Sequence, residues 1–85
     1  MNINTTNIDK VLDRLEKKDP VLFSAVCKKI AQIAALDENE IRHFKNLRHS
    51  LSGCKRVHVS SFVLMFKLEG DTIIFDRFLH HDDAY

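Results

Sequence analysis

The chain has 85 residues, of which 45% are hydrophobic, and it contains only two glycines and one proline. This length allows one hydrophobic core and excludes a multidomain enzyme, while the apolar content excludes a disordered chain. The formal net charge of +1 is close to neutral, so the sum over the whole chain gives no reason to expect a polyanionic partner.

No segment reaches the roughly 18 apolar residues that span a bilayer, and the first ten residues lack the charged-then-apolar pattern of a signal peptide. We therefore expect a cytoplasmic protein that makes no contact with a membrane. Cys27 and Cys54 occur without a CxxC spacing, which predicts two reduced thiols and neither a disulfide nor a zinc site.

Apolar residues at helical spacing predict a first helix over about residues 7–18, with Thr6 or Asn7 as its cap. Asp19 and Pro20 then supply an N-cap and a first helical position, so we expect a second helix that extends to about Leu36. Two amphipathic helices with almost no linker between them predict a helical hairpin.

The chain changes from helical to strand-like character near Cys54. The residues before it show no sustained period, and from Cys54 the apolar period becomes two. In the strand that this pattern predicts, Val57 and Val59 point to one side, whereas Cys54, Arg56 and His58 point to the other.

Two more strands complete the predicted sheet. Residues 62–68 are almost all apolar, which is typical of a central strand covered on both faces, and residues 72–79 are rich in β-forming side chains. Short turns join the three strands as an antiparallel meander. The expected organisation is one domain in four parts: a helical hairpin at about 7–36, a connecting basic loop at 37–53, the antiparallel meander at 54–79 and a C-terminal tail at 80–85.

Charge is segregated along the chain. The stretch from residue 42 to residue 67 contains six cations and no acid, and the acids gather at 9–19, 37–40 and 69–83. The six cations are Arg42, Lys45, Arg48, Lys55, Arg56 and Lys67. A basic surface of this kind favours a polyanion such as RNA, although charge without other features is also typical of an ordinary solvated face.

Histidines occupy positions that could form a site. His49 ends the basic loop, His58 lies on the outward side of the first meander strand, and His80 and His81 follow the last strand. A pair of imidazoles brought together can act as general base and general acid near neutral pH, whereas an isolated exposed histidine is usually inert. No HxH or HxxxH spacing and no paired cysteine occurs, so we predict no metal site.

The aromatic residues have a structural interpretation beside a functional one. Tyr85 is the last residue, and a terminal position is more often frayed than functional. Phe62, Phe66 and Phe75 fall within apolar runs, so we expect them in the core rather than stacked on bases.

Four segments, in this order and spacing, resemble a known family. They read LEKKDPVLFSAVCKKIAQI, FKNLRHSLSGCKRVHV, FVLMFKLEGDTIIF and LHHDDAY. Together they are similar to the RelE/ParE superfamily of type II toxin–antitoxin systems, in particular to its archaeal and YafQ-like RNase branch, over about residues 8–85.

The resemblance implies an α+β fold. In this fold a two-helix hairpin packs on one face of a three- to four-stranded antiparallel sheet. Family members usually begin with a strand before the hairpin, and residues 1–5 are the segment available for it here. We therefore expect this first strand to be short or missing.

The resemblance also implies an activity. RNase members of the superfamily cut messenger RNA in the ribosomal A site without a metal or other cofactor. The 2′-OH of the substrate attacks the adjacent phosphate, while protein groups transfer the protons and neutralise the phosphate. The YafQ-like branch uses histidines, and by motif position His49, His58 and His81 match them.

Roles follow from the resemblance residue by residue. His81 would be one member of the acid/base pair, and His58 would be the other member or a phosphate contact. His49 and Arg56 would stabilise charge on the phosphate, and Tyr85 would orient the RNA. Which histidine accepts the proton stays open. Three cations would hold the RNA or ribosomal backbone: Lys45, Arg48 and Lys55.

Two positions depart from the family pattern, and two alternative functions remain. Val63 stands where many RelE-type toxins have an arginine, and Ser60 and Ser61 stand where the YafQ-like branch has an aspartate. The superfamily also includes ParE toxins, which poison DNA gyrase without RNase activity. The alternatives to an endoribonuclease are therefore a gyrase-inhibiting toxin and an inactive module that only binds antitoxin. All three imply a cognate antitoxin protein and a toxin–antitoxin hetero-oligomer.

Overall fold

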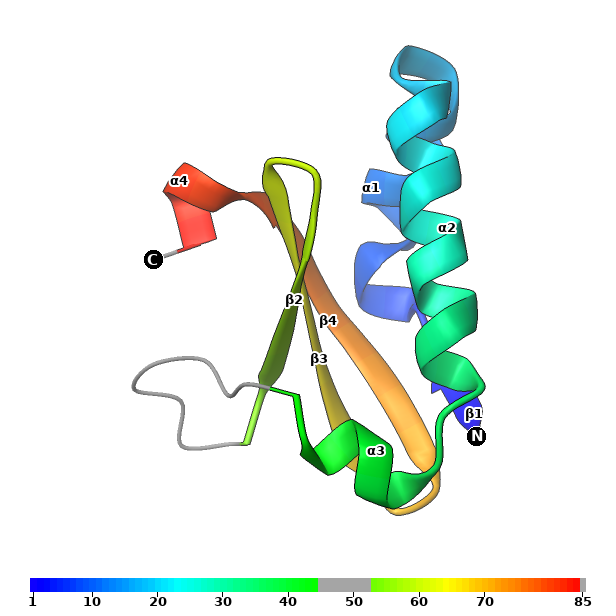
Figure 1. Ribbon diagram of the computed structural model, residues 1–85. Coiled ribbons are helices and arrows are strands. Elements are labelled where there is room, and N and C mark those ends of the chain that lie inside the picture. The colour runs from blue at the N-terminus through cyan, green and yellow to red at the C-terminus, as the bar shows by residue number, and fades with distance from the viewer. Residues whose placement is uncertain (45–52, 85) are drawn as a thin grey trace.

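The computed structural model describes residues 1–44 and 53–84, and residues 45–52 and 85 lie outside the described part. The fold is α+β, as the sequence predicts, because the helical hairpin α1–α2 lies along one side of a four-stranded sheet (Figure 1). The elements in chain order are β1 (Asn2–Asn4), the 3₁₀ turn η1 (Thr6–Ile8), α1 (Asp9–Lys18), α2 (Pro20–Ala34), α3 (Glu38–Arg42), β2 (Lys55–Val59), β3 (Phe62–Glu69), β4 (Thr72–His80) and α4 (His81–Ala84).

The junction between α1 and α2 forms as the sequence predicts. The N–H of Leu22 donates to Asp19 Oδ1 at 3.1 Å, and Pro20 is the first residue of α2. An aspartate cap followed by proline starts a helix because the cap satisfies a free N–H group and proline lacks one. α2 ends at Ala34, two residues before the expected end at Leu36.

The predicted cap of α1 is wrong. Thr6 and Asn7 belong to the 3₁₀ turn, and Ile8 occupies the N-cap position without a side-chain hydrogen bond. Asn7 makes a long-range contact instead, since its Nδ2 donates to Asp76 Oδ1 in β4 at 3.2 Å. Asn7 therefore ties the start of the hairpin to the sheet and does not cap α1.

A short helix that the periodicity does not predict, α3, lies in the connection after α2. The N–H of Glu40 donates to Asp37 Oδ1 at 2.8 Å, and the N–H of Asp37 donates to Glu40 Oε1 at 3.2 Å, which forms a capping box. Ile41 is buried, and the Phe44 ring meets the Phe66 ring edge to face with centroids 5.3 Å apart. α3 therefore packs on the same core as the hairpin.

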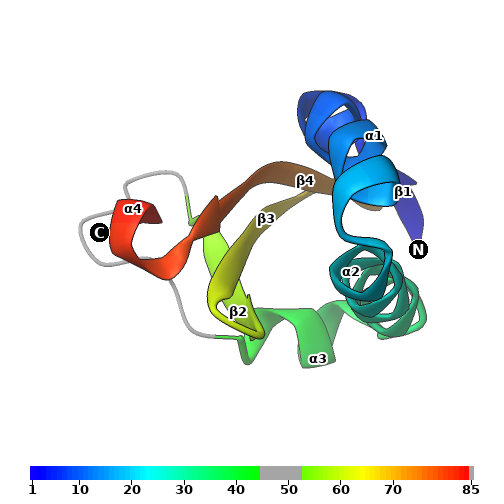
Figure 2. The same ribbon diagram turned by 90° about the horizontal axis from the view of Figure 1, so that it is seen from above.

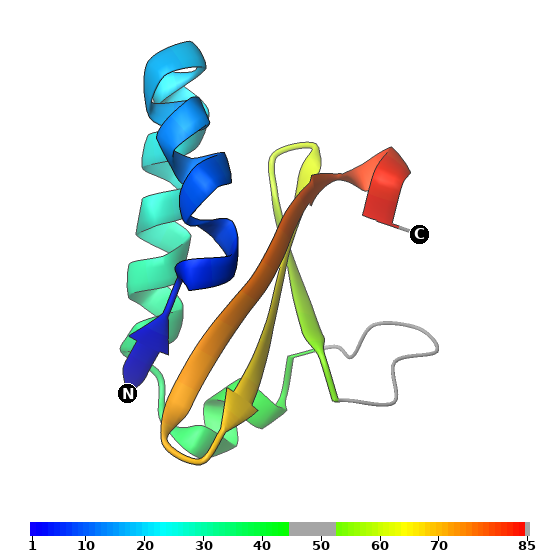
Figure 3. The same ribbon diagram turned by 180° about the vertical axis from the view of Figure 1, so that it is seen from behind.

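The sheet has the strand order β1-β4-β3-β2, and the predicted antiparallel meander β2-β3-β4 is confirmed. The expected first strand is present and short, with three residues. It pairs with β4 in parallel, from Asn2 beside Thr72 to Asn4 beside Ile74, so the sheet is mixed rather than wholly antiparallel (Figure 3). Parallel pairing needs a crossover connection, and the hairpin provides part of it.

Two apolar clusters cover the two faces of the sheet. The larger core lies between the sheet and the hairpin and includes Val26, Leu64 and Phe75, and the phenylalanines at 62, 66 and 75 all contribute to it, as predicted. The smaller cluster, on the opposite face, consists of Cys54, Val63, Met65 and Leu79. Figure 2 shows the sheet between the hairpin and α4. We name the face of the smaller cluster the α4 face and the opposite one the hairpin face.

Candidate active site

Alternate positions of β2 place Arg56 and His58 on the α4 face. They point away from the hairpin because Val57 and Val59 pack against the larger core. In the register of β2 and β3, Arg56 pairs with Met65 and His58 pairs with Val63. The cation and the imidazole therefore stand in successive rows of one face, as the period-two pattern predicts.

A further cation of the α4 face, Arg77, comes from β4 and is absent from the set predicted from the sequence. Met65 pairs with Arg77 while Phe66 pairs with Phe75, so Asp76 is an extra residue that forms a β-bulge. The bulge places Arg77 beside Met65 on the α4 face. Arg56 and Arg77 thus flank Met65 from either side, about 10 Å apart at the backbone, since two strand spacings separate them.

The bulge explains why the sequence pattern misses Arg77. Strict alternation from Ile73 and Phe75 would put residue 77 on the hairpin face. The sequence signal is the pair Phe75 and Phe78, which both join the larger core although they are three residues apart. Two core residues at that spacing in one strand require an irregularity between them.

His58 and His81 lie together at one end of the α4 face. Their ring centroids are 5.5 Å apart, and the ring planes are inclined by 31°. The N–H of His81 donates to the carbonyl of Ser61 at 2.8 Å, which ties the start of α4 to the turn between β2 and β3. Because the carbonyl of Ser61 lies only three residues after His58, this bond brings the two imidazoles together although their strands are not neighbours.

The adjacent histidine, His80, points to the hairpin face. It pairs with Phe62, and the two rings meet edge to face with centroids 5.3 Å apart. Phe62 itself packs against the larger core and stacks on Phe78. The alternation of β4 therefore separates two histidines that are neighbours in sequence, and His81 is the one that meets His58.

The other residues predicted for the site divide into two groups. Lys55 lies on the hairpin face, where it pairs with Phe66, and its Nζ donates to the carbonyl of Arg42 in α3 at 3.3 Å. The structure therefore does not bring Lys55 together with Arg56 and His58. The remaining predicted residues lie outside the described part of the chain: Lys45, Arg48, His49 and Tyr85.

Cys54 is buried in the small apolar cluster of the α4 face. Burial raises the pKa of its thiol, Asp76 raises this pKa further, and Lys67 and Arg77 lower it. The raised pKa keeps Cys54 protonated at neutral pH, and a protonated thiol is a poor nucleophile. Cys54 is therefore a packing residue of the apolar cluster on this face and not a reacting group.

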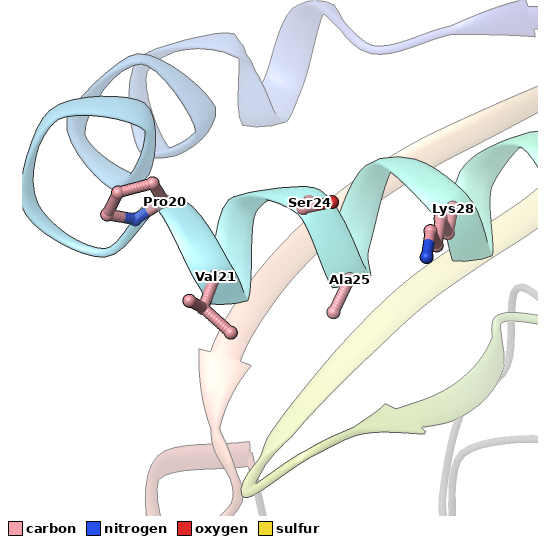
Figure 4. A pocket seen from close by; sticks show the side chains of 5 residues that line it. All are labelled: Pro20, Val21, Ser24, Ala25 and Lys28. Carbon is pink, nitrogen blue, oxygen red and sulfur yellow. The ribbon is translucent and has the colours of Figure 1, made fainter.

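The described part of the chain has a hollow that does not include the histidine pair. A hollow on α2 is lined by Pro20, Val21, Ser24, Ala25 and Lys28 (Figure 4). Sites for small molecules are usually concave and apolar, whereas His58 and His81 are exposed side chains on a strand and a helix. An exposed pair of this kind suits a macromolecular substrate that brings its own surface to the protein.

Residues 1–44 and 53–84 show neither a metal-binding cluster nor a membrane-spanning helix. No group of three histidine, cysteine or acidic side chains in these ranges is arranged to hold a metal ion. None of the helices in the same ranges has the length and apolar character that crossing a bilayer requires.

The α4 face combines groups that suit chemistry on a phosphodiester. Imidazoles such as His58 and His81 can accept or donate a proton near neutral pH. Guanidinium groups such as those of Arg56 and Arg77 bind phosphate oxygens through paired N–H groups and stabilise developing negative charge. Both kinds of group come from the same side of the sheet.

Comparison with known proteins bears on the family of the chain. The chain is 42% identical over 82 residues to a protein of the archaeon Methanocaldococcus jannaschii that is named "Putative toxin RelE4". The matched segment covers 93% of this chain and 83% of that protein. No family model matches the chain, and no solved structure matches it. On the strength of this identity over nearly the whole chain, the protein belongs to the RelE family of toxins.

Proposed function

We propose that this protein is the toxin of a type II toxin–antitoxin system and that it is a metal-independent, ribosome-dependent endoribonuclease. Its substrate is messenger RNA in the ribosomal A site, and cleavage inhibits translation in the cytoplasm. The observation that carries the proposal is the pair His58 and His81, whose ring centroids are 5.5 Å apart on the same face as Arg56 and Arg77.

The proposed reaction is an internal transesterification. One imidazole of the pair accepts the proton of the 2′-OH, and the 2′-oxygen forms a bond to the adjacent phosphorus. The bond from phosphorus to the 5′-oxygen breaks, and the other histidine, as an imidazolium, protonates that oxygen. The products are a 2′,3′-cyclic phosphate and a 5′-hydroxyl, so neither water nor a metal is needed for this step.

The guanidinium groups have an electrostatic role in this reaction. The phosphate gains negative charge as the 2′-oxygen attacks, and Arg56 and Arg77 stabilise that charge from positions on either side of Met65. His49 adds to this stabilisation and Tyr85 orients the RNA, as the family resemblance implies.

We further propose a cognate antitoxin that covers the helices and the sheet in an inactive hetero-oligomer. β2 is an edge strand of the described sheet, and an edge strand offers backbone groups for a partner to pair with. Lys45, Arg48 and Lys55 contact RNA or the ribosome in this proposal, with Lys55 acting from the hairpin face.

Cleavage by single-histidine variants tests the proposed function. Wild type, His58→Ala and His81→Ala are added to ribosomes programmed with a defined mRNA, and cuts are mapped by primer extension. We expect each variant to cleave about 10²- to 10⁴-fold more slowly than wild type, which is the usual contribution of a general acid or base. His43→Ala is the matched control, because His43 is exposed next to α3, which packs on the hairpin face.

Two results would overturn the proposal. One is growth arrest by the wild-type protein with intact mRNA and undiminished toxicity of both variants, which would favour a gyrase-inhibiting toxin. The other is loss of cleavage after the toxin is dialysed against EDTA and returned to magnesium buffer with the ribosomes, followed by recovery when zinc is added. We expect full activity after that dialysis.

A further inference from the structure

His80 and His81 make contacts on opposite faces of the sheet. The contacts of His80 affect where the side chain of His81 points. The edge-to-face contact with Phe62 holds the His80 ring on the hairpin face. From there its Nδ1 accepts a hydrogen bond from the N–H of Asp82 at 3.2 Å. His80 is the residue directly before α4, so this bond runs from the residue that precedes the helix into its first turn.

This bond has the form of a helix cap. The first N–H groups of a helix have no partner within the helix, and a side chain at the N-cap position can accept one of them. Histidine can do so through Nδ1 only when that nitrogen carries no proton. The hydrogen bond therefore places the ring proton of neutral His80 on Nε2.

The cap fixes the backbone on one side of His81, and a second bond fixes it on the other. The N–H of His81 donates to the carbonyl of Ser61 at 2.8 Å, and the next N–H along the chain, that of Asp82, is held by His80. Two consecutive N–H groups with fixed partners leave little freedom in the backbone dihedrals of His81. The direction of the His81 side chain toward His58 follows from that backbone.

We propose that His80 is a positioning residue, which holds His81 against His58 by capping α4 with its Nδ1. The proposal rests on the proposed ribonuclease function, because it assigns His80 a role in orienting a reacting group. It also gives the two adjacent histidines distinct tasks, with His81 at the reaction and His80 on the opposite face, in contact with the core.

Two substitutions of His80 separate the cap from other roles. His80→Asn keeps an acceptor oxygen on Cγ, close to the place of Nδ1, whereas His80→Leu keeps an apolar contact with Phe62 and loses the acceptor. We expect His80→Leu to lower kcat about 10- to 100-fold with little change in KM, because a small misplacement of a reacting group has effects of this size. We expect His80→Asn to stay within about threefold of wild type.

A third variant tests whether the carboxylate of Asp82 acts in place of its N–H. Asp82 Oδ2 lies 3.6 Å from His80 Nδ1, and Oδ1 lies 3.8 Å from His81 Nδ1. Asp82→Asn removes this charge and keeps the backbone N–H, so we expect kcat close to wild type. A fall to the level of His80→Leu would assign the effect to the carboxylate and overturn the proposal.

A readout without RNA keeps this proposal separate from the proposed function. We expect nuclear Overhauser contacts between the His58 and His81 rings in wild type and His80→Asn, and their loss in His80→Leu while the melting curve stays cooperative. Persistence of these contacts in His80→Leu would overturn the proposal that the His80 cap holds His81 against His58. Failure of the ribonuclease would appear differently, as wild-type ring contacts without any cleavage of mRNA.

Discussion

Replacing Arg77 with alanine tests whether the cations of the α4 face bind RNA. The bulge at Asp76 places Arg77 on the same face as Arg56 and His58. Its side chain is exposed and lies outside both apolar clusters, so the fold is expected to tolerate its loss. We expect the variant to bind RNA more weakly and to cleave it more slowly.

The expected size of the effect follows from one lost phosphate contact. Hydrogen bonds to charged groups contribute about 1.5–3 kcal/mol, which corresponds to about a 10- to 150-fold loss of affinity. The loss of one cation that neutralises a phosphate also lowers the slope of log affinity against log salt by about 0.7 for a single-stranded substrate. The substitution changes the formal net charge from +1 to 0.

Binding is measured with ribosomes whose A-site codon carries 2′-deoxynucleotides, because these cannot undergo attack by a 2′-oxygen. Arg14→Ala is the matched control: Arg14 is exposed on α1, in the hairpin, and its loss has the same effect on net charge. We expect Arg14→Ala to follow wild type at every salt concentration. An equal loss of slope in both variants would refute the reasoning, since net charge and not the α4 face would then govern binding.

Three further predictions concern stability. Phe66 is fully buried against Phe44 and Phe75, so Phe66→Ala lowers the unfolding free energy in denaturant titrations by about 3–5 kcal/mol; a loss below about 1 kcal/mol would contradict the packing. Asp19→Ala removes the cap of α2 and costs about 1 kcal/mol in the same titration, and no loss would count against the cap. Burial raises the pKa of the Cys54 thiol, so above the ordinary thiol pKa the unfolded chain loses a proton that the folded chain keeps. The unfolding free energy therefore falls as the pH rises above the ordinary thiol pKa, and Cys54→Ala makes this fall shallower. An unchanged pH dependence in Cys54→Ala would show that the Cys54 thiol is not its source.

The hairpin and the meander were predictable because their signals are local. Asp19 and Pro20 start a helix by the chemistry of their own backbone and side chain, and the structure contains that cap. Val57 and Val59 alternate with polar residues, and this alternation determines the face of Arg56 and His58 whatever the strand pairs with.

Other features depend on contacts between residues far apart in sequence. β1 has three exposed residues and no apolar pattern, and its existence depends on pairing with residues Thr72 to Ile74. α3 is too short to show a period, although its capping residues Asp37 and Glu40 are visible in the sequence. The bulge at Asp76 becomes visible only when Phe75 and Phe78 are known to share one core.

The acid-free stretch from residue 42 to residue 67 does not form one surface in the part of it that the structure describes. Arg42 pairs with Glu38 in α3, and Lys55 donates to the carbonyl of Arg42, so both lie with the elements of the hairpin face. Arg56 and His58 lie on the α4 face because strand alternation sends neighbours to opposite sides.

The α4 face in turn gains residues from outside that stretch. Arg77 reaches it through a bulge, and His81 reaches it through the bond of its N–H to Ser61. A net charge of +1 and an acid-free stretch with six cations are therefore both incomplete descriptions of this protein. Three features assemble its candidate site: the alternation of side chains along β2, the bulge in β4 and the first turn of α4. Substitutions at these features are expected to lower RNA cleavage more than the removal of an equal charge from the hairpin.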